Sequence, residues 1–363
     1  MDGMRDVFQN PVINEDMENI YSRDIPTNKL YGKSILVTGA TGMLASYLIY
    51  YLIWLNERYN AGIRIIALAR NKEKIKSRFG MYADKQYFKS VIADVCNPIE
   101  IDVPVDYIVH AASFASPQYY TTNPVEVASA NVIGTYNCLK LAVKKKVDHF
   151  LYFSSGDVYG KMPDGTGMFS ETQMGITDSM DIHSCYGESK RMGETFCKSF
   201  AEEYGVNASA VRIGHTYAPT MDIDNDPRVF ASFMNCAVKK QDIVMYSDGS
   251  AMRPFCYITD AVAAFIILLT KGKMGEAYNM TNTDMFVSVC ELAETIASLE
   301  PTAHIKVIRQ VRDNNDSYIE NKSNHANCPG SDKLKALGWN CEYDIRHGFG
   351  RILRYFRYLE QYD

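Results

Sequence analysis

A tyrosine and a lysine four residues apart form the pair with the clearest chemical potential in this sequence. Tyr186 and Lys190 enclose Gly-Glu-Ser, and a spacing of four places both side chains on one face of a helix. A phenol with a pKa of about 10 is a poor base at neutral pH, but a nearby ammonium group favours its phenolate. The pair therefore predicts a tyrosine that takes a proton from a substrate hydroxyl.

Two serines follow a largely apolar run and are expected at the carboxyl end of a strand. Ser155 would hold the oxygen from which Tyr186 takes the proton, and Ser154 precedes it. Lys190 would also reach the ribose of a nicotinamide cofactor. An isolated Tyr-x-x-x-Lys match is more often an exposed helix pair. The catalytic interpretation therefore requires a cofactor site elsewhere in the chain.

A glycine turn supplies that cofactor site. The apolar run 35–37 leads through Thr38 into Gly39-Ala-Thr-Gly42, and a helical pattern follows at once. Gly39 permits the tight turn, and Gly42 removes a side chain that would keep a pyrophosphate away from the backbone. The small Ala45 allows close packing of the helix, whose N-terminal amides and dipole favour phosphate. Strand, turn and helix together predict dinucleotide binding.

Alternating apolar runs and helical patterns must position these groups. Buried runs separated by helices are typical of a parallel sheet that is covered on both faces. The sequence thus predicts an α/β fold with a doubly wound, Rossmann-type parallel sheet and ligands at the carboxyl ends of its strands. The expected strands are 34–38, 64–68, 89–93, 107–111, 150–154 and 208–213, and the expected helices are 42–59, 125–145, 186–204 and 346–362.

The same patterns divide the chain into three parts. Residues 1–32 are polar with weak periodicity, so we expect an extension outside the main fold. Residues 33–215 carry the dinucleotide-binding sheet. Residues 216–363 have a looser pattern, which predicts a smaller C-terminal α/β lobe that binds substrate and is interleaved with the first domain.

Composition excludes several classes of protein. The 363 residues carry a net charge of −5, which gives no reason to expect nucleic acid or an anionic membrane as partner. The longest apolar stretch, 43–55, is too short to span a bilayer, and the N-terminus has no apolar signal core. Nine cysteines without a Cys-x-x-Cys pair indicate reduced thiols in a cytoplasm. Because the seven histidines are also scattered, no metal site is predicted.

Taken together, the motifs resemble the extended short-chain dehydrogenase/reductase family, in particular its NAD-dependent nucleotide-sugar epimerases, dehydratases and decarboxylases. The similarity runs from about residue 33 to residue 358 and is greatest to UDP-glucuronate decarboxylases. It implies a nucleotide-diphosphate sugar as substrate and a homodimer formed through the helices 125–145 and 186–204. The motifs that carry it begin at Thr38, Asp94, His110, Asn131, Ser154, Tyr186, Arg212 and Arg253.

The resemblance also assigns roles to individual residues. The residues that would be catalytic are Ser155, Asp157, Tyr186 and Lys190. The residues that would contact the substrate are Ser116, His215, Arg228 and Arg253. Guanidinium groups suit the oxygens of a diphosphate, which supports the two arginines.

A larger set would contact the cofactor, with Asp94 holding the adenine. Its members are Gly39, Thr41, Gly42, Met43, Leu44, Arg70, Asp94, Val95, Ala111, Ala112, Ser113, Asn131, Ser154, Tyr186, Lys190, Ile213 and His215.

Departures from the decarboxylase pattern leave the reaction open. Ser155-Gly156-Asp157 stands where decarboxylases have Thr-Ser-Glu. Dehydratases have a proton-donating acid at the position of Gly156, so elimination is disfavoured. The stretch 324–332 lacks the arginine that decarboxylases place there. His215 replaces the family's usual asparagine, either as a ligand or as a packed histidine.

The end of the second strand leaves the cofactor open between NAD and NADP. Enzymes that use NAD commonly have an acid there, whereas this chain has Ala69 followed by Arg70. Arg70 would suit the 2′-phosphate of NADP, although it is equally well explained as the start of a solvated basic helix.

Three functions remain after these observations. The first is an epimerase or decarboxylase that works through nicotinamide-dependent oxidation to a keto-sugar. The second is an NADPH-dependent reductase of a nucleotide-linked keto-sugar, favoured by Arg70 and the missing arginine. The third is a non-catalytic dinucleotide sensor, which would not need Ser155, Tyr186 and Lys190 together.

Overall fold

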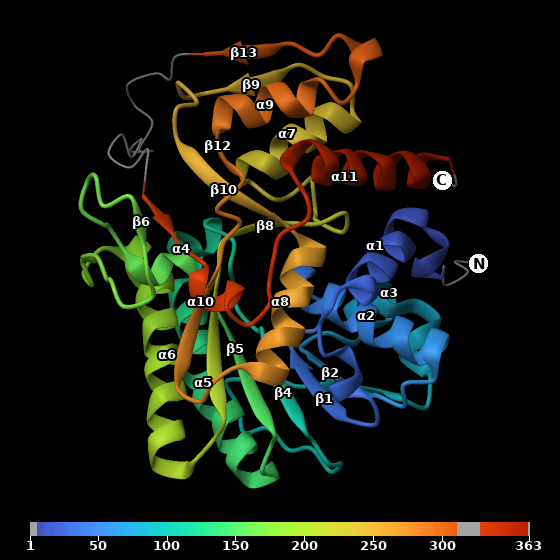
Figure 1. Cartoon of the computed structure of the whole chain (residues 1–363), viewed down its shortest axis with the longest axis vertical. Helices are drawn as coiled ribbons and strands as arrows, with labels where there is room; N and C mark the ends of the chain where they lie inside the picture. Colours follow the sequence, from blue (N-terminus) through green and yellow to red (C-terminus); the bar gives the residue numbers. More distant parts are fainter. Residues whose placement is uncertain (1–5, 311–326, 362–363) are drawn as a thin grey trace.

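A seven-stranded sheet organises the computed structural model, which describes residues 6–310 and 327–361 (Figure 1). The strand order is β11-β7-β5-β4-β1-β2-β3, and every neighbouring pair is parallel, as predicted for a doubly wound sheet. All six expected strands are present, whereas β11 was not expected. The strands are β1 (Ser34–Thr38), β2 (Arg64–Ala69), β3 (Phe88–Ile92), β4 (Tyr107–His110), β5 (His149–Ser155), β7 (Ala208–Ile213) and β11 (Glu276–Met280).

Helices bury both faces of this sheet. In β1, Ile35 and Val37 pack into the cluster formed with α2 and α8, while Leu36 packs into the cluster on the α5 and α6 side (Figure 1). Successive side chains of a strand point to opposite faces, so a strand buried on both sides is apolar throughout. The covering helices are α2 (Met43–Tyr59), α5 (Pro124–Lys145), α6 (Cys185–Tyr204) and α8 (Ile258–Lys271).

A smaller C-terminal lobe lies over the carboxyl edge of the sheet. Its three-stranded sheet has the order β12-β10-β8, and a two-stranded sheet pairs β13 with β9. β8 follows β7 after one residue, so the polypeptide passes directly from the main sheet into the lobe. Its main elements are β8 (His215–Tyr217), β9 (Ile243–Met245), β10 (Met252–Tyr257), β12 (Phe286–Ser288), β13 (Val307–Arg309), α7 (Val229–Val238), α9 (Val289–Ala297) and α11 (Ile345–Glu360).

The N-terminal segment differs from the expectation, because it lies inside the fold and not outside it. α1 (Pro11–Ser22) contacts α2, α8 and α11, and its Ile13, Met17 and Ile20 are fully buried. These apolar positions are spaced by three and four residues among polar ones. The polar composition of this segment therefore conceals an amphipathic helix that packs between the two lobes.

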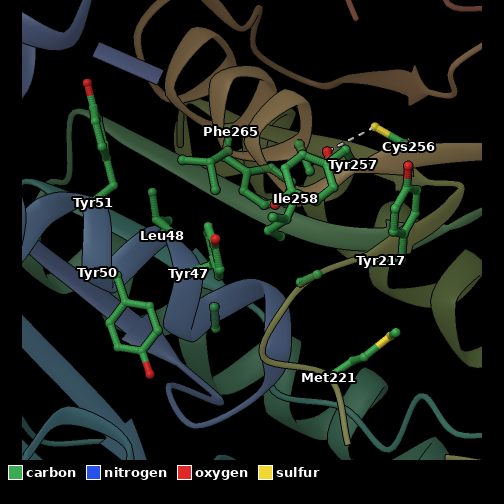
Figure 2. Packing of buried hydrophobic residues seen from close by; sticks show 14 of the residues in the cluster. Tyr47, Leu48, Tyr50, Tyr51, Tyr217, Met221, Cys256, Tyr257, Ile258 and Phe265 are labelled. Carbon is green, nitrogen blue, oxygen red and sulfur yellow. Dashed lines mark hydrogen bonds between the residues drawn. The ribbon is translucent and has the colours of Figure 1, made fainter. Parts of the chain in front are cut away.

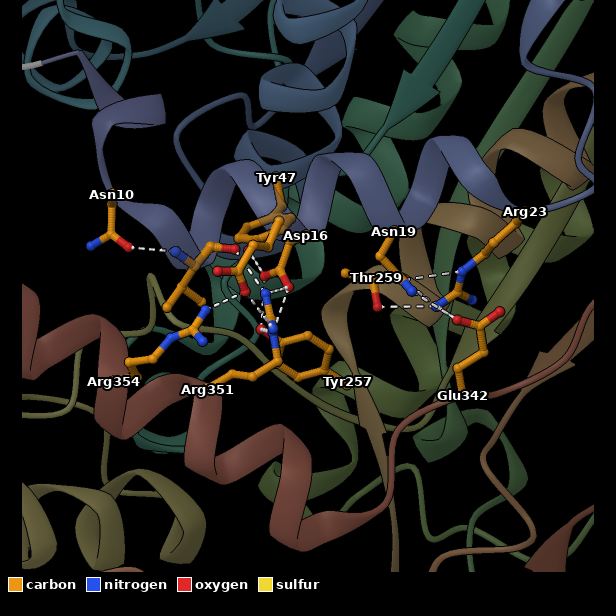
Figure 3. A network of polar contacts seen from close by, with 12 residues as sticks. Asn10, Asp16, Asn19, Arg23, Tyr47, Tyr257, Thr259, Glu342, Arg351 and Arg354 are labelled. Carbon is orange, nitrogen blue, oxygen red and sulfur yellow. Dashed lines mark hydrogen bonds and ion pairs between the residues drawn. The ribbon is translucent and has the colours of Figure 1, made fainter.

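A buried polar network fixes α1 in this position (Figure 3). Asp16 has no exposed surface and accepts hydrogen bonds from the hydroxyls of Tyr47 in α2 and Tyr257 in β10. Its carboxylate also pairs with Arg351 of α11 at 2.6 Å. Around it, the aromatic side chains of α2, α8 and the lobe form a continuous core that includes Tyr217 (Figure 2).

The remaining elements are short. They are α3 (Lys72–Phe79), α4 (Gln118–Thr122), α10 (Asp332–Lys335), β6 (Met168–Phe169), β14 (Cys328–Pro329) and the 3-10 turns Val7–Gln9, Thr27–Leu30, Gly80–Asp84, Gly156–Tyr159, Ile182–Ser184 and Pro301–Ala303. Across the described ranges, every helix is too short or too polar to cross a membrane.

Candidate active site

The first two turns of α6 bring the tyrosine and the lysine together as the spacing predicts. Tyr186 is 6% exposed and Lys190 is 2% exposed, so both are buried. Lys190 Nζ lies 5.6 Å from the centre of the Tyr186 ring. The ammonium donates a hydrogen bond of 2.6 Å to the carbonyl oxygen of Phe153 in β5, which fixes its position.

Burial makes the protonation of this lysine sensitive to its neighbours. Loss of water lowers the pKa of Lys190 to about 7, while the carboxylates of Glu194 and Asp157 act in the opposite direction. Burial and Asp157 raise the pKa of Tyr186 above its usual value, and the hydroxyl of Ser155 and the charge of Arg228 partly offset this. A cation next to the phenol is therefore needed before the phenol can lose its proton.

Asp157 lies beside this pair, close enough for its charge to act on both Tyr186 and Lys190. It lies in the 3-10 turn that follows β5, where its backbone N–H donates to Ser155 Oγ at 3.2 Å. Its side chain is exposed to solvent, yet the surrounding protein raises its pKa and Lys190 partly offsets this rise. Gly187 of α6 lets the turn approach closely, because a Cβ there would lie 2.7 Å from the carbonyl oxygen of Asp157.

Ser154 points away from this group. Its hydroxyl donates to Glu194 Oε1 at 2.5 Å, and Arg212 of β7 pairs with the same carboxylate at 2.7 Å. The side chain of Ser154 is therefore engaged by α6, and only its backbone is free to face a cofactor. Glu194 was not predicted, although its position one turn after Lys190 on the same helix face could have indicated it.

Three of the predicted substrate residues gather on the lobe side. His215 of β8 is paired in register with Phe255 of β10, two residues after Arg253. Although the side chain of His215 is exposed, the surrounding protein, and then the charges of Arg253 and Arg228, lower its pKa to about 3, so its imidazole is neutral at neutral pH. The charges of Arg253 and Arg228 thus act near a neutral histidine, and Arg228 is itself paired with Asp226 at 2.5 Å.

Tyr120 of α4 is part of the same site and was not predicted from the sequence. Its ring stacks on that of Tyr186 with centres 4.8 Å apart and planes 12° apart. The predicted Ser116 lies just before α4, and its buried hydroxyl has no hydrogen-bond partner among the described residues. Stacking on Tyr120 restricts the rotation of the Tyr186 ring.

A cleft of about 1130 Å³ opens at the carboxyl edge of the sheet. Gly39 has a φ of 62°, and a Cβ at this position would lie 2.7 Å from Cα of Ala112, so only glycine fits. The other residues predicted for the cofactor are not among those that form the walls of the cleft; they are Met43, Leu44, Asn131, Ser154, Tyr186, Lys190, Ile213 and His215. Predicted residues that do line the cleft are Gly39, Thr41, Gly42, Arg70, Asp94, Val95, Ala111, Ala112 and Ser113.

Asn131 lies behind the catalytic helix. Its Nδ2 donates to Ser189 Oγ at 2.9 Å, and its Oδ1 is buried without a hydrogen-bond partner among the described residues. Ser189 in turn donates to the carbonyl oxygen of Tyr186. Asn131 thus contacts α6 at Ser189, and through Ser189 it is connected to the backbone of Tyr186.

Arg70 lies at the mouth of this cleft. Its side chain is 58% exposed, its Nη1 lies 4.0 Å from Asp94 Oδ2, and its guanidinium lies 4.5 Å from the centre of the Phe114 ring. Unexpectedly, the N-terminal residues Gln9 and Asn10 and the end of α11 also line the cleft.

Comparison with known proteins places this chain in a family. The model of the NAD dependent epimerase/dehydratase family matches residues 35–281. The chain belongs to this family. UDP-glucuronic acid decarboxylase 6 of Arabidopsis thaliana is 32% identical over 328 residues, which cover 89% of this chain and 88% of the relative. UDP-glucuronic acid decarboxylase 1 of Danio rerio is 28% identical, over 89% of this chain and 72% of the relative.

Solved structures show the same fold. The UDP-glucose 4-epimerase of Thermotoga maritima, crystallised with UDP-glucose, has a TM-score of 0.73 and 22% identity, and the alignment covers 90% of this chain and 99% of that one. The dTDP-glucose 4,6-dehydratase of Bacillus anthracis, in complex with NAD, has a TM-score of 0.70 and 21% identity over 91% and 98%. The chain is thus an NAD-dependent enzyme of nucleotide-sugar metabolism.

Proposed function

We propose that this enzyme oxidises a nucleotide-linked sugar at a carbinol carbon, allows epimerisation or decarboxylation of the keto-sugar, and then returns the hydride. The observation that carries the proposal is the buried pair of Tyr186 and Lys190, with Ser155 and Asp157 beside it. A sensor that only binds a dinucleotide has no use for a buried ammonium next to a buried phenol, because burying both is unfavourable.

Each residue of the pair has a defined task in this proposal. Tyr186 takes the proton from the substrate hydroxyl, and Ser155 binds the same oxygen. Lys190 stabilises the phenolate by its charge, while its hydrogen bond to the carbonyl of Phe153 keeps it in place. Asp157, whose exposed side chain lies beside Tyr186 and has a raised pKa, orients or protonates the intermediate.

The residues around the cleft fit a dinucleotide. The bare backbone at Gly39 and Gly42 admits a pyrophosphate at the N-terminus of α2, and Asp94 lies where the adenine would be bound. NAD, when bound, supplies the hydride acceptor. We assign the cofactor contacts to the predicted residues that line the cleft, together with the backbone of Ser154.

UDP-glucuronate is the first substrate to test, because the relatives that are about 30% identical are named for it. Arg228 and Arg253 would bind the diphosphate, and His215 would contact the substrate as a neutral donor or acceptor. The missing arginine in the stretch 324–332, of which 324–326 lie outside the described residues, favours epimerisation over decarboxylation.

The test is to incubate the purified enzyme with UDP-glucuronate, UDP-glucose and UDP-N-acetylglucosamine and to follow each sugar by proton NMR. Conversion of one of them without consumption of added cofactor supports the proposal. The identity of the cofactor extracted from the purified enzyme distinguishes this function from the two alternatives. Retained oxidised NAD indicates a recycling enzyme, exchangeable NADPH indicates the reductase favoured by Arg70, and binding without turnover indicates the sensor.

We further propose a homodimer through the outer face of α5 and α6. Ile133, Tyr136 and Met192 are exposed on these helices, whereas Leu139 is fully buried in the core. Leu139 follows Ile133 by six residues, so it turns toward the sheet. A dimer by light scattering at micromolar concentration is the expected result, and a monomer would contradict it.

A further inference from the structure

Two thiols and a carboxylate from separate segments meet between α8 and the segment that precedes α11. Cys256 of β10, Asp260 in the first turn of α8 and Cys341 each place one ligand atom within 4.8 Å of the other two. Cys256 and Asp260 have no exposed surface, and Cys341 is partly buried. Zinc binds thiolates and carboxylates at about 2.0–2.3 Å, which puts its ligand atoms roughly 4 Å apart. Small side-chain rotations would therefore bring the three groups to coordination distance.

Only one of the two carboxylate oxygens of Asp260 has a hydrogen-bond or ion-pair partner among the described residues. Its Oδ1 pairs with Arg23 at 2.7 Å and accepts a hydrogen bond from the backbone of Glu342 at 3.2 Å. Its Oδ2 is buried and has no hydrogen-bond partner among the described residues. A carboxylate oxygen in this position is unfavourable unless a positive group or a donor binds it.

The charges that the cluster would carry with a metal bound suit a divalent cation. Once metal binding has displaced the thiol protons, two thiolates and one carboxylate carry three negative charges, and Arg23 supplies one positive charge. Arg23 is itself almost fully buried and also donates to Thr259 (Figure 3). One doubly charged cation would make the cluster neutral, which removes most of the unfavourable free energy of burying these groups. Among divalent cations, thiolate ligands favour zinc over magnesium and calcium.

We infer that Cys256, Asp260 and Cys341 bind one zinc ion. Binding displaces the two thiol protons, so that both sulfurs coordinate as thiolates. The fourth position is left to a water molecule or to the hydroxyl of Tyr217, which is buried in the same core, near Cys256 in Figure 2, and also has no hydrogen-bond partner in the described part of the chain.

This zinc would act on the substrate side of the enzyme without touching the substrate. Cys256 follows Arg253 by three residues in β10, and β10 pairs with β8, which begins at His215. A metal that joins β10 to the segment before α11 would therefore hold the two strands that carry the predicted substrate residues. The inference does not depend on the proposed reaction, since metal content is measured without turnover.

The experiment compares zinc content in the full-length enzyme and two matched cysteine variants. Each protein is dialysed against Zn²⁺ under reducing conditions, desalted and analysed by mass spectrometry of the metal. We expect one zinc per chain in the wild type and in Cys236→Ser, a partly buried thiol of α7 outside the cluster. Cys341→Ser should lose the bound zinc and melt at a lower temperature.

Replacement of zinc by Co²⁺ gives a readout that needs no variant. Thiolate coordination produces a charge-transfer absorption, which we expect in the wild type and in Cys236→Ser. The inference is overturned if the wild type holds no more zinc than Cys341→Ser and shows no such absorption. A disulfide between Cys256 and Cys341 in freshly purified protein, detected by peptide mapping, would overturn it in favour of a redox pair.

Discussion

Two cations with little exposed surface, Arg351 and Lys190, differ in how many of their N–H groups have a partner in the protein. Arg351 of α11 pairs with Asp16 at 2.6 Å and Glu15 at 3.1 Å and donates to the carbonyl oxygen of Val12 at 3.0 Å. Lys190 donates to one backbone carbonyl and otherwise faces aromatic rings. A cation whose donors are all engaged can only stabilise the fold, whereas one that is left partly unpaired can respond to a developing negative charge.

The two cations also connect different elements of the fold. Arg351 connects α1, β10 and α11 and so ties the N-terminal helix to the C-terminal lobe (Figure 3). Lys190 connects α6 to β5 and lies next to the phenol that we propose as the base. Substitutions at the first cation should therefore affect unfolding, and substitutions around the second should affect turnover.

The largest effect is expected for Arg351→Met. Removing this guanidinium leaves Asp16 buried without its counter-charge, and breaking a buried ion pair lowers the free energy of unfolding by about 3–5 kcal/mol. Urea denaturation measures the change. Arg354→Met, one turn away, removes an exposed arginine that pairs with Glu15, and it should change stability by less than about 1 kcal/mol. Equal losses in the two variants would mean that the Asp16 network has no special role.

Tyr186→Phe should lower turnover by roughly 10²-fold or more, because it removes the proposed proton acceptor while the ring still stacks on Tyr120. Steady-state rates on the accepted nucleotide-sugar give the measurement, and calorimetry checks that cofactor binding is unchanged. Tyr204→Phe at the exposed end of α6 is the matched control. Full activity of Tyr186→Phe would refute the proposed mechanism.

Asp157→Asn distinguishes a chemical role from a structural one. If the carboxylate orients or protonates the intermediate, turnover should fall by about tenfold to a hundredfold with an unchanged melting temperature. If it only stabilises the turn after β5, the melting temperature should fall and the rate should not. Because the exposed side chain of Asp157 lies beside Tyr186, we expect the first result.

Asp16 should make stability depend on pH. Burial raises the pKa of its carboxyl from 3.8 to about 6 in the folded state, so the folded protein holds a proton that the unfolded chain has already lost. The contribution of Asp16 to the free energy of unfolding therefore falls as pH rises from about 4 to about 6, and it no longer changes above that range. The difference in unfolding free energy between wild type and Asp16→Asn should fall by up to about 3 kcal/mol, because each pKa unit corresponds to about 1.4 kcal/mol. A difference that rises or stays constant would contradict the assignment.

The smallest effect is expected for Arg70→Ala. An exposed guanidinium beside the cleft would bind a 2′-phosphate, so NADP affinity should fall several-fold more than NAD affinity. Calorimetric titration of both dinucleotides measures this ratio. Lys76→Ala, an exposed cation of α3 that does not line the cleft, should alter neither affinity. Equal weakening of the two dinucleotides would remove the phosphate role.

Local sequence patterns were sufficient for the elements that position the site. The apolar runs predicted six of the seven strands of the main sheet, since strands buried on both faces are apolar throughout. The four-residue spacing of Tyr186 and Lys190 determined that they share a helix face, because helix geometry depends only on local hydrogen bonds. β11 was missed because Glu276 and Asn279 interrupt its apolar pattern.

Tertiary structure alone decided which distant segments meet. The sequence of α1 could not reveal that Asp16 pairs with Arg351, nor could that of α4 reveal that Tyr120 stacks on Tyr186. Likewise, no spacing rule connects Cys256 with Cys341. Periodicity reports the face of an element that is buried, but not the element that buries it. Those partners are set by the packing of the whole chain, in which each contact depends on all the others.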